Sequence, residues 1–142
     1  SKMSKVAVVY WSGTGNTEAM AQAVEAGAKE AGAETALFQV SDFGAEKMDE
    51  FDAVAFGCPA MGAEELEDSE FLPVFESCEA KLNGKKTGLF GSYGWGSGEW
   101  MQSWEDTCKG DGAVLAADSV IANDAPDDDA LSQCKALGAA LA

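Results

Sequence analysis

The segment Ser12–Thr17 (SGTGNT) contains several residues that are suited to binding a phosphate group. Main-chain N–H groups in glycine-containing turns and at helix N-termini bind phosphate, and neutral side-chain donors assist them. A simple helix cap needs one side chain of this kind, whereas this segment offers four. The sequence therefore predicts an anion site just before a helix, with these candidate ligands: Ser12, Thr14, Asn16 and Thr17, together with the main chain at Gly15.

The composition of this loop excludes the commoner phosphate loops. A Walker A loop ends in Gly-Lys-Ser/Thr, but here the loop ends in Asn16-Thr17-Glu18. A dinucleotide-binding fingerprint has its third glycine where Glu18 stands. A Cys-x5-Arg phosphatase loop is excluded because all nine basic residues of the chain are lysines. A phosphate monoester held by neutral donors remains.

Two further loops are Pro59–Asp68 (PAMGAEELED) and Ser92–Trp100 (SYGWGSGEW). Both contain residue types that are suited to packing on a flat ring. Trp95 and Trp100 lie in a glycine-rich loop that cannot easily bury both, and an exposed tryptophan there is expected to stack on a planar ligand. Met61 has a polarizable thioether suited to the opposite face of the same ring. The alternative is that these side chains fill gaps between helices. Together with the phosphate loop, they favour a ligand with a flat ring and a single phosphate.

Composition also limits the function. Without histidine or arginine, the chain has no Ser-His-Asp or Cys-His catalytic site, no histidine zinc site and no guanidinium clamp. The four cysteines form no C-x-x-C pair and are expected to be reduced core thiols: Cys58, Cys78, Cys108 and Cys134. The net charge of -16 argues against nucleic acid and favours basic protein partners.

The hydropathy pattern predicts a single domain over residues 1–142, with no membrane span and no cleavable leader in Ser1–Lys5. A cytoplasmic location is therefore expected. The predicted strands are Lys5–Tyr10, Thr35–Val40, Ala53–Cys58, Thr87–Ser92 and Ala113–Ala122. The helices that alternate with them are Asn16–Ala31, Glu70–Leu82, Glu99–Lys109 and Asp127–Leu141.

This alternation predicts an α/β fold, a five-stranded parallel sheet with helices on both faces. Ligands of such folds bind at the carboxyl ends of the strands. The loops after the first, third and fourth strands are therefore expected to meet there.

In combination, SGTGNT, PAMGAEELED and GSYGWGSGEW resemble the corresponding loops of flavodoxins, in particular the short-chain flavodoxins of anaerobic bacteria. The resemblance covers nearly the whole chain. It implies strand order 2-1-3-4-5 and a non-covalently bound FMN at the switch point between the first and third strands.

The resemblance also implies a role for individual residues. The FMN phosphate would be bound by Ser12, Thr14, Asn16 and Thr17. Met61 and Trp95 would cover the two faces of the flavin ring. The Gly62 carbonyl would meet flavin N5, and the Glu64 carboxylate would meet flavin N3. Gly94 and Gly96 would offer main-chain N–H groups to the pyrimidine oxygens. Ser92 would reach the phosphate or ribityl chain, and Asn123 the ribityl chain, with Asp124 competing for that position. The remaining implied contacts are Gly15, Ala60, Ala63 and Tyr93. Pro59 and Ala63 depart from the residues that some relatives have.

The function implied is low-potential one-electron transfer between redox partners through a semiquinone, without a substrate of the protein's own. Basic reductases and oxidoreductases would be the partners, and the carrier would be a monomer. The acidic stretches Glu64–Glu70 and Asp127–Asp129 are either solvated surface or docking sites. The charge of Glu64–Glu70 would also oppose further reduction of the flavin. The alternatives are an FMN enzyme of similar fold, such as an NAD(P)H:quinone reductase or a ribonucleotide-reductase-activating flavoprotein, and a non-flavin phosphate-binding module.

Overall fold

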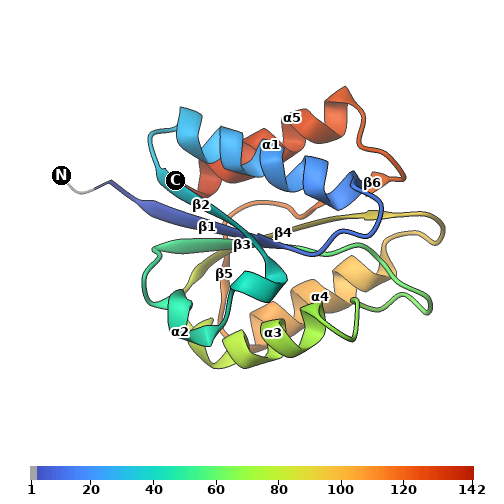
Figure 1. Cartoon of the computed structure of the whole chain (residues 1–142), viewed down its shortest axis with the longest axis horizontal. Coiled ribbons are helices and arrows are strands. Elements are labelled where there is room, and N and C mark those ends of the chain that lie inside the picture. The colour runs from blue at the N-terminus through green and yellow to red at the C-terminus, as the bar shows by residue number, and fades with distance from the viewer. Residues whose placement is uncertain (1–2) are drawn as a thin grey trace.

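The computed structural model describes residues 3–142 as one parallel sheet between two layers of helices (Figure 1). Its strands are β1 (Lys5–Tyr10), β2 (Glu34–Gln39), β3 (Ala53–Gly57), β4 (Lys86–Tyr93), β5 (Val114–Leu115) and β6 (Val120–Asn123). Its helices are α1 (Asn16–Glu30), α2 (Ala45–Met48), α3 (Phe71–Cys78), α4 (Glu99–Gly110) and α5 (Asp128–Leu141). Two 3₁₀ turns, η1 (Val40–Asp42) and η2 (Glu79–Lys81), follow β2 and α3.

The strand order is β2-β1-β3-β4-β5, which confirms the predicted topology. All pairs are parallel; for example, Val8 lies beside Leu37 of β2 and Ala55 of β3. The strands β1 and β3 are buried along nearly their whole length, as expected for a parallel sheet covered on two faces.

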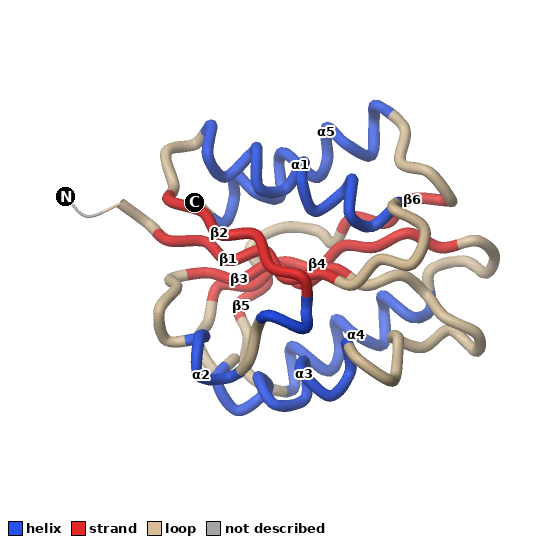
Figure 2. The backbone as a smooth tube through the Cα atoms, viewed as in Figure 1, coloured by secondary structure: helices blue, strands red, loops and turns tan. Residues whose placement is uncertain are grey.

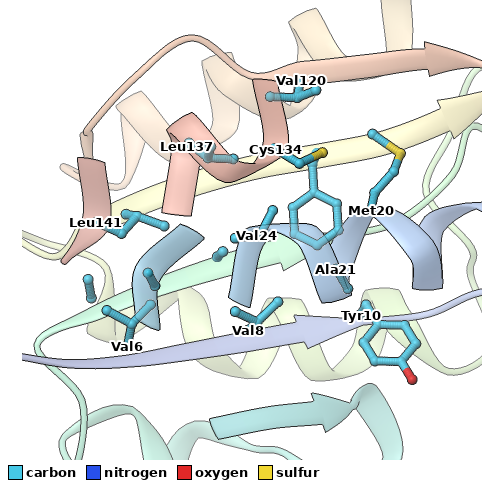
Figure 3. Packing of buried hydrophobic residues seen from close by; sticks show 14 of the residues in the cluster. Val6, Val8, Tyr10, Met20, Ala21, Val24, Val120, Cys134, Leu137 and Leu141 are labelled. Carbon is cyan, nitrogen blue, oxygen red and sulfur yellow. The ribbon is translucent and has the colours of Figure 1, made fainter. Parts of the chain in front are cut away.

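Alternating residues of β1 face two separate hydrophobic clusters. Val6, Val8 and Tyr10 pack under α1 and α5, as Figure 3 shows, while Ala7 and Val9 face the α3 and α4 side. This separation follows from the two-residue period of a strand. The four cysteines are free and buried in these clusters, which confirms their prediction as core thiols.

The predicted fifth strand, Ala113–Ala122, is wrong as one continuous element. It is two short strands, and both pair with β4: Val114 and Leu115 pair near its start, and Val120–Asn123 near its end. In the segment between them, Ser119 Oγ donates to Glu105 Oε2 of α4 over 2.5 Å. This polar contact lies outside the strand ladder, so the hydropathy pattern did not reveal the interruption.

The helices α1 and α5 approach each other closely through two glycines. A Cβ atom on Gly138 would lie 1.9 Å from the carbonyl oxygen of Val24, and one on Gly27 would lie 2.0 Å from that of Lys135. The main chains of the two helices are therefore in direct contact, and no side chain fits between them at these points.

The loops after β1, β3 and β4 gather at the right-hand end of the sheet in Figure 2. Parallel strands bring their carboxyl ends to one edge, so this grouping was expected. In residues 3–142, no helix is both long and apolar enough to cross a membrane.

Candidate cofactor site

A cavity of about 270 Å³ lies where the three loops meet. No basic residue of the described range 3–142 lines it. Its lining consists of Trp11, Gly13, Thr14, Asn16, Pro59, Ala60, Met61, Ser92, Tyr93, Gly94 and Asp124. Seven of the sixteen predicted site residues line this cavity, although they lie as far apart in the sequence as Thr14 and Gly94, and the other nine lie outside its lining.

The first loop is closed by one of its own side chains. Ser12 Oγ accepts hydrogen bonds from the main-chain N–H groups of Gly15, over 3.1 Å, and Glu18, over 3.2 Å. Gly15 has φ +96°, a conformation that favours glycine, and α1 begins at the next residue, Asn16. Thr14 and Asn16 are left facing the cavity at the positive end of the α1 dipole.

Thr17 links the first loop to the end of β4. Its hydroxyl lies 3.1 Å from that of Ser92, and both residues are buried. Ser92 lines the cavity and Thr17 supports it from behind. Direct contacts of Ser12 and Thr17 with a phosphate stay predictions.

The second loop contains a tight turn. Met61 and Glu65 form an antiparallel bridge, with the N–H of Met61 donating to the carbonyl of Glu65 over 2.8 Å and the reverse bond measuring 3.1 Å. Between them, Gly62 has φ +39° and Glu64 has φ +61°. Gly62 has open space where a Cβ would stand, so its constraint is conformational and not steric.

Glu64 connects this turn to the third loop. Its Oε2 accepts from the main-chain N–H of Trp100, in the first turn of α4, over 3.1 Å. A Cβ on Gly96 would lie 2.0 Å from Glu64 Oε1, so the glycine leaves room for this carboxylate. The negative charge of the Glu64 carboxylate is also favourable at the N-terminus of α4, which carries a partial positive charge. One carboxylate therefore caps a helix and borders the site.

Two large side chains flank the site with unusual exposure. Trp95 is 71% exposed and Met61 is 38% exposed. Trp95 lies outside the lining of the cavity, whereas Met61 belongs to it. An exposed indole beside an apolar cavity wall suits the covering of a planar ring.

The acidic segment Glu64–Glu70 is not uniform, because Glu65, Asp68 and Glu70 are exposed, as predicted for solvated surface, whereas Glu67 departs from that prediction. Glu67 is buried and accepts from Ser69 Oγ and from three main-chain N–H groups, those of Ser69, Glu70 and Phe71, at 2.8 to 2.9 Å. Burial alone would raise the pKa of Glu67, but these hydrogen bonds outweigh it and hold the pKa at about 2. Glu67 thus caps the start of α3 from within the protein.

Asp127–Asp129 likewise has a structural role. The Asp127 side chain accepts from the N–H of Ala130 over 2.8 Å, and Asp128 and Asp129 lie in the first turn of α5. Carboxylates at these positions stabilise a helix N-terminus. Asp127–Asp129 are nevertheless exposed, so a docking role of either acidic stretch stays a prediction.

Replacing Glu67 with Gln should lower the free energy of unfolding at pH 7 by about 1–3 kcal/mol, because a charged acceptor of backbone N–H groups becomes neutral. The pKa of Glu67 is depressed in the folded state from 4.5 to about 2. Its stabilisation is therefore present above pH 4.5 and is lost as the pH falls toward 2.

Urea denaturation between pH 2 and pH 7 would measure this difference, with the exposed neighbour Asp68→Asn as the matched control. Equal losses for the two variants, or a loss independent of pH, would contradict this role of Glu67.

The structure also shows one lining residue to which the sequence gave no role, Trp11, and it separates Asp124 from Asn123. Trp11 lines the cavity, and its Nε1–H donates to Glu70 Oε1 over 3.2 Å, which links the first two loops. Asp124, at φ +55°, faces the cavity, whereas the Asn123 amide donates to the carbonyl of Tyr93 over 3.3 Å. The ribityl contact of Asn123 stays a prediction. The position of Trp11, directly before the phosphate loop, was the available signal.

A larger cavity of about 430 Å³ lies on the other side of the first loop, toward β2. Its lining includes Glu18 and Glu70, and the Glu18 carboxylate accepts from the Tyr10 hydroxyl over 2.9 Å. Two carboxylates disfavour a phosphate dianion. The smaller cavity has one carboxylate, that of Asp124, beside the neutral donors Thr14, Asn16 and Ser92, and is therefore the better phosphate site.

Comparison with known proteins gives the same assignment. The family model described as flavodoxin matches residues 8–138. The chain belongs to the flavodoxin family. It is 49% identical to a flavodoxin of Megasphaera elsdenii over 137 residues, covering 96% of this chain and 98% of that protein. It is 45% identical to a flavodoxin of Clostridium beijerinckii over 121 residues, covering 85% and 88% of the two chains.

Solved flavodoxin structures have the same fold. The solution structure of two-electron reduced Megasphaera elsdenii flavodoxin superposes with a TM-score of 0.88 at 49% identity, covering 96% of this chain and 97% of that one. A flavodoxin from the domain Archaea has a TM-score of 0.87 at 28% identity, covering 96% and 95%. The resemblance seen in the three loops is confirmed.

Membership of this family makes the chain an FMN-binding protein that carries electrons between redox partners, and not an enzyme with its own substrate. A flavodoxin-fold reductase is the less favoured function. The site fits FMN on its own chemistry, because neutral donors and a helix N-terminus adjoin an apolar wall that carries Met61 and Tyr93.

Proposed function

We propose that FMN is held by the three loops around the 270 Å³ cavity. The observation that carries this proposal is that a single cavity is lined by the phosphate-type loop, Met61 and Tyr93 together. Bound FMN supplies the one-electron chemistry. The protein binds and orients it through these residues: Ser12, Thr14, Gly15, Asn16, Thr17, Ala60, Met61, Gly62, Ala63, Glu64, Ser92, Tyr93, Gly94, Trp95, Gly96 and Asn123.

The roles within this set follow from chemistry and position. Thr14, Asn16 and the N–H groups that begin α1 bind the phosphate, and Ser12 and Thr17 hold the loop in place while offering further hydroxyls. Met61 and Trp95 cover the ring. Gly62 presents its carbonyl, and Glu64 its second carboxylate oxygen, to the polar edge of the ring. Because no lysine between residues 3 and 142 lines the cavity, the phosphate charge stays uncompensated and lowers the potential of the flavin.

The main chain at Gly62 has a direct influence on the potential. A β-branched residue resists φ +39°, so Gly62→Thr should turn the carbonyl away from the site. We expect the one-electron reduced form to be destabilised by about 1–2 kcal/mol relative to the oxidised form. This change lowers the midpoint potential of the first one-electron step by roughly 40–85 mV. A spectrally monitored redox titration measures this shift, with Gly32→Thr as the matched control, because Gly32 also has a positive φ, +97°, and open space at its Cβ position but lies after the end of α1. The same shift in both variants would argue against a specific role of Gly62.

The partners we propose are basic redox proteins that meet the protein at its cofactor edge, with the protein acting as a monomeric single domain in the cytoplasm. The net charge of -16 supports electrostatic attraction to such partners. Glu65 stands beside the site on the exposed turn, whereas Glu34 is exposed at the start of β2, the opposite end of that strand from the site loops.

These two residues allow a test of docking at constant net charge. Glu65→Lys should slow electron transfer to a basic cytochrome several-fold at low salt, and added salt should reduce the difference. Glu34→Lys changes the total charge equally and should have little effect. Stopped-flow rates at about 10 and 200 mM salt measure both. Equal slowing by the two variants would indicate that only total charge matters, and not the site.

A further inference from the structure

Trp100 makes two hydrogen bonds to the loop that carries Met61 and Gly62. Its main-chain N–H donates to Glu64 Oε2 over 3.1 Å, and its indole Nε1–H donates to the carbonyl of Cys58 over 3.2 Å. Only 1% of Trp100 is exposed. A single buried residue of α4 therefore holds both ends of the segment 58–64.

The Cys58 carbonyl lies where β3 ends and the loop begins. The N–H of Cys58 donates to the carbonyl of Phe90 over 3.1 Å, and that of Ala60 donates to the carbonyl of Ser92 over 3.0 Å. Between these two bonds, the Cys58 carbonyl is directed to the indole. The indole of Trp100 thus binds the chain where the end of β3 is still hydrogen-bonded to β4, just before the turn begins.

Gly91 of β4 makes this contact possible. A Cβ at this position would lie 2.1 Å from the Cys58 carbonyl oxygen and 3.3 Å from Cζ2 of Trp100. The missing side chain leaves the space in which the carbonyl and the ring meet. The ring of Trp100 also packs against Tyr93, with centroids 5.5 Å apart, and Tyr93 lines the cofactor cavity.

Trp104, one helical turn later, provides the contrast. It is 2% exposed and packs edge-on against Phe71 and Phe75. Within residues 3–142 its Nε1 has no hydrogen-bond partner. Two equally buried indoles on one helix therefore differ in their contacts: Trp100 donates a hydrogen bond to the second loop and packs against Tyr93, whereas Trp104 packs against phenylalanines of α3.

We propose that Trp100 is a positioning residue for electron transfer. Its two hydrogen bonds fix the segment 58–64 to α4 and so determine how the turn presents Met61 and Gly62 to the flavin. This inference rests on the proposed function of that turn. A buried carbonyl that loses its donor is unfavourable, so without the indole N–H the base of the loop shifts to find another partner.

The test compares Trp100→Phe with Trp104→Phe. Both variants shorten a buried indole on the same helix and create similar packing defects. Only Trp100→Phe removes the bond to Cys58. In the apoprotein, amide hydrogen exchange at Ala60 and Met61, relative to core amides, should accelerate about tenfold in Trp100→Phe and not in Trp104→Phe.

The second measurement is the redox titration of the FMN-loaded variants. The equilibrium constant of the first one-electron step should change at least threefold in Trp100→Phe, which is about 28 mV at 59 mV per tenfold. Trp104→Phe should leave it unchanged. An unchanged constant in Trp100→Phe, or equal changes in both variants, would overturn the proposal even if exchange accelerated.

If Trp100→Phe does not fold, replacing Trp100 with benzothienylalanine keeps the ring shape and removes only the N–H. The same exchange and redox results are expected and would be judged in the same way. Failure of the unmodified protein to bind FMN would overturn the proposed function itself. A null result at Trp100, in a protein that binds FMN normally, would overturn this inference alone.

Discussion

Replacing Asn16 with Asp should weaken FMN binding by roughly 30- to 1,000-fold. Asn16 lines the cavity and begins α1, so the new carboxylate stands next to the proposed phosphate position. An FMN phosphate carries about 1.5 to 2 negative charges at pH 7. With an effective dielectric near 20, unit charges about 5 Å apart repel by about 3 kcal/mol, and solvent at this half-buried site leaves a net loss of about 2–4 kcal/mol.

The same substitution should not harm the fold. An aspartate in the first turn of a helix stabilises it by about 0.3–1 kcal/mol, so the apoprotein should be as stable as before or more stable. Riboflavin lacks the phosphate and should bind the variant nearly as well as the unmodified protein. Loss of affinity for FMN alone would therefore identify the phosphate site.

Fluorescence titration of the apoprotein with FMN and with riboflavin measures both affinities. Gln22→Glu, on the exposed part of α1, is the matched control, because it makes the same change from amide to carboxylate away from the cavity. If both flavins were weakened equally, or if Gln22→Glu had the same effect as Asn16→Asp, the phosphate would not be held at Asn16.

Gly138→Ala should lower the free energy of unfolding by about 2–3 kcal/mol, the largest effect expected on stability. The added methyl group would stand 1.9 Å from the Val24 carbonyl oxygen and 2.8 Å from the Ala28 nitrogen, both of which are main-chain atoms. Helices α1 and α5 would have to separate, which disturbs the core under them in Figure 3. This overpacking outweighs the gain of up to about 1 kcal/mol from the helix propensity of alanine.

Gly110→Ala is the matched control, because Gly110 ends α4 and nothing lies within 4 Å of its Cβ position. We expect it to be neutral or to stabilise the protein by up to about 1 kcal/mol. Urea denaturation of both apoproteins gives the comparison. A Gly138→Ala variant as stable as Gly110→Ala would show that the two helices can separate without loss of packing.

The sequence was sufficient to predict the fold class and the edge of the sheet where the three loops meet. Apolar runs such as Lys5–Tyr10 predict buried parallel strands, and parallel strands align their carboxyl ends. The three loops therefore had to meet, and their residue types indicated a phosphate and a flat ring. The strand order and FMN came from the resemblance to flavodoxins, which the family comparison confirmed.

Only the tertiary structure decided how similar residues divide into different roles. Glu65 and Glu67 belong to one acidic run, yet Glu67 turns inward to meet four donors because the chain curves there into α3. Likewise, Trp100 and Trp104 share a helical face, but only Trp100 reaches a carbonyl, that of Cys58, beside Gly91. Sequence periodicity reports which face a residue lies on, whereas a hydrogen bond depends on atoms from distant segments meeting within about 3 Å.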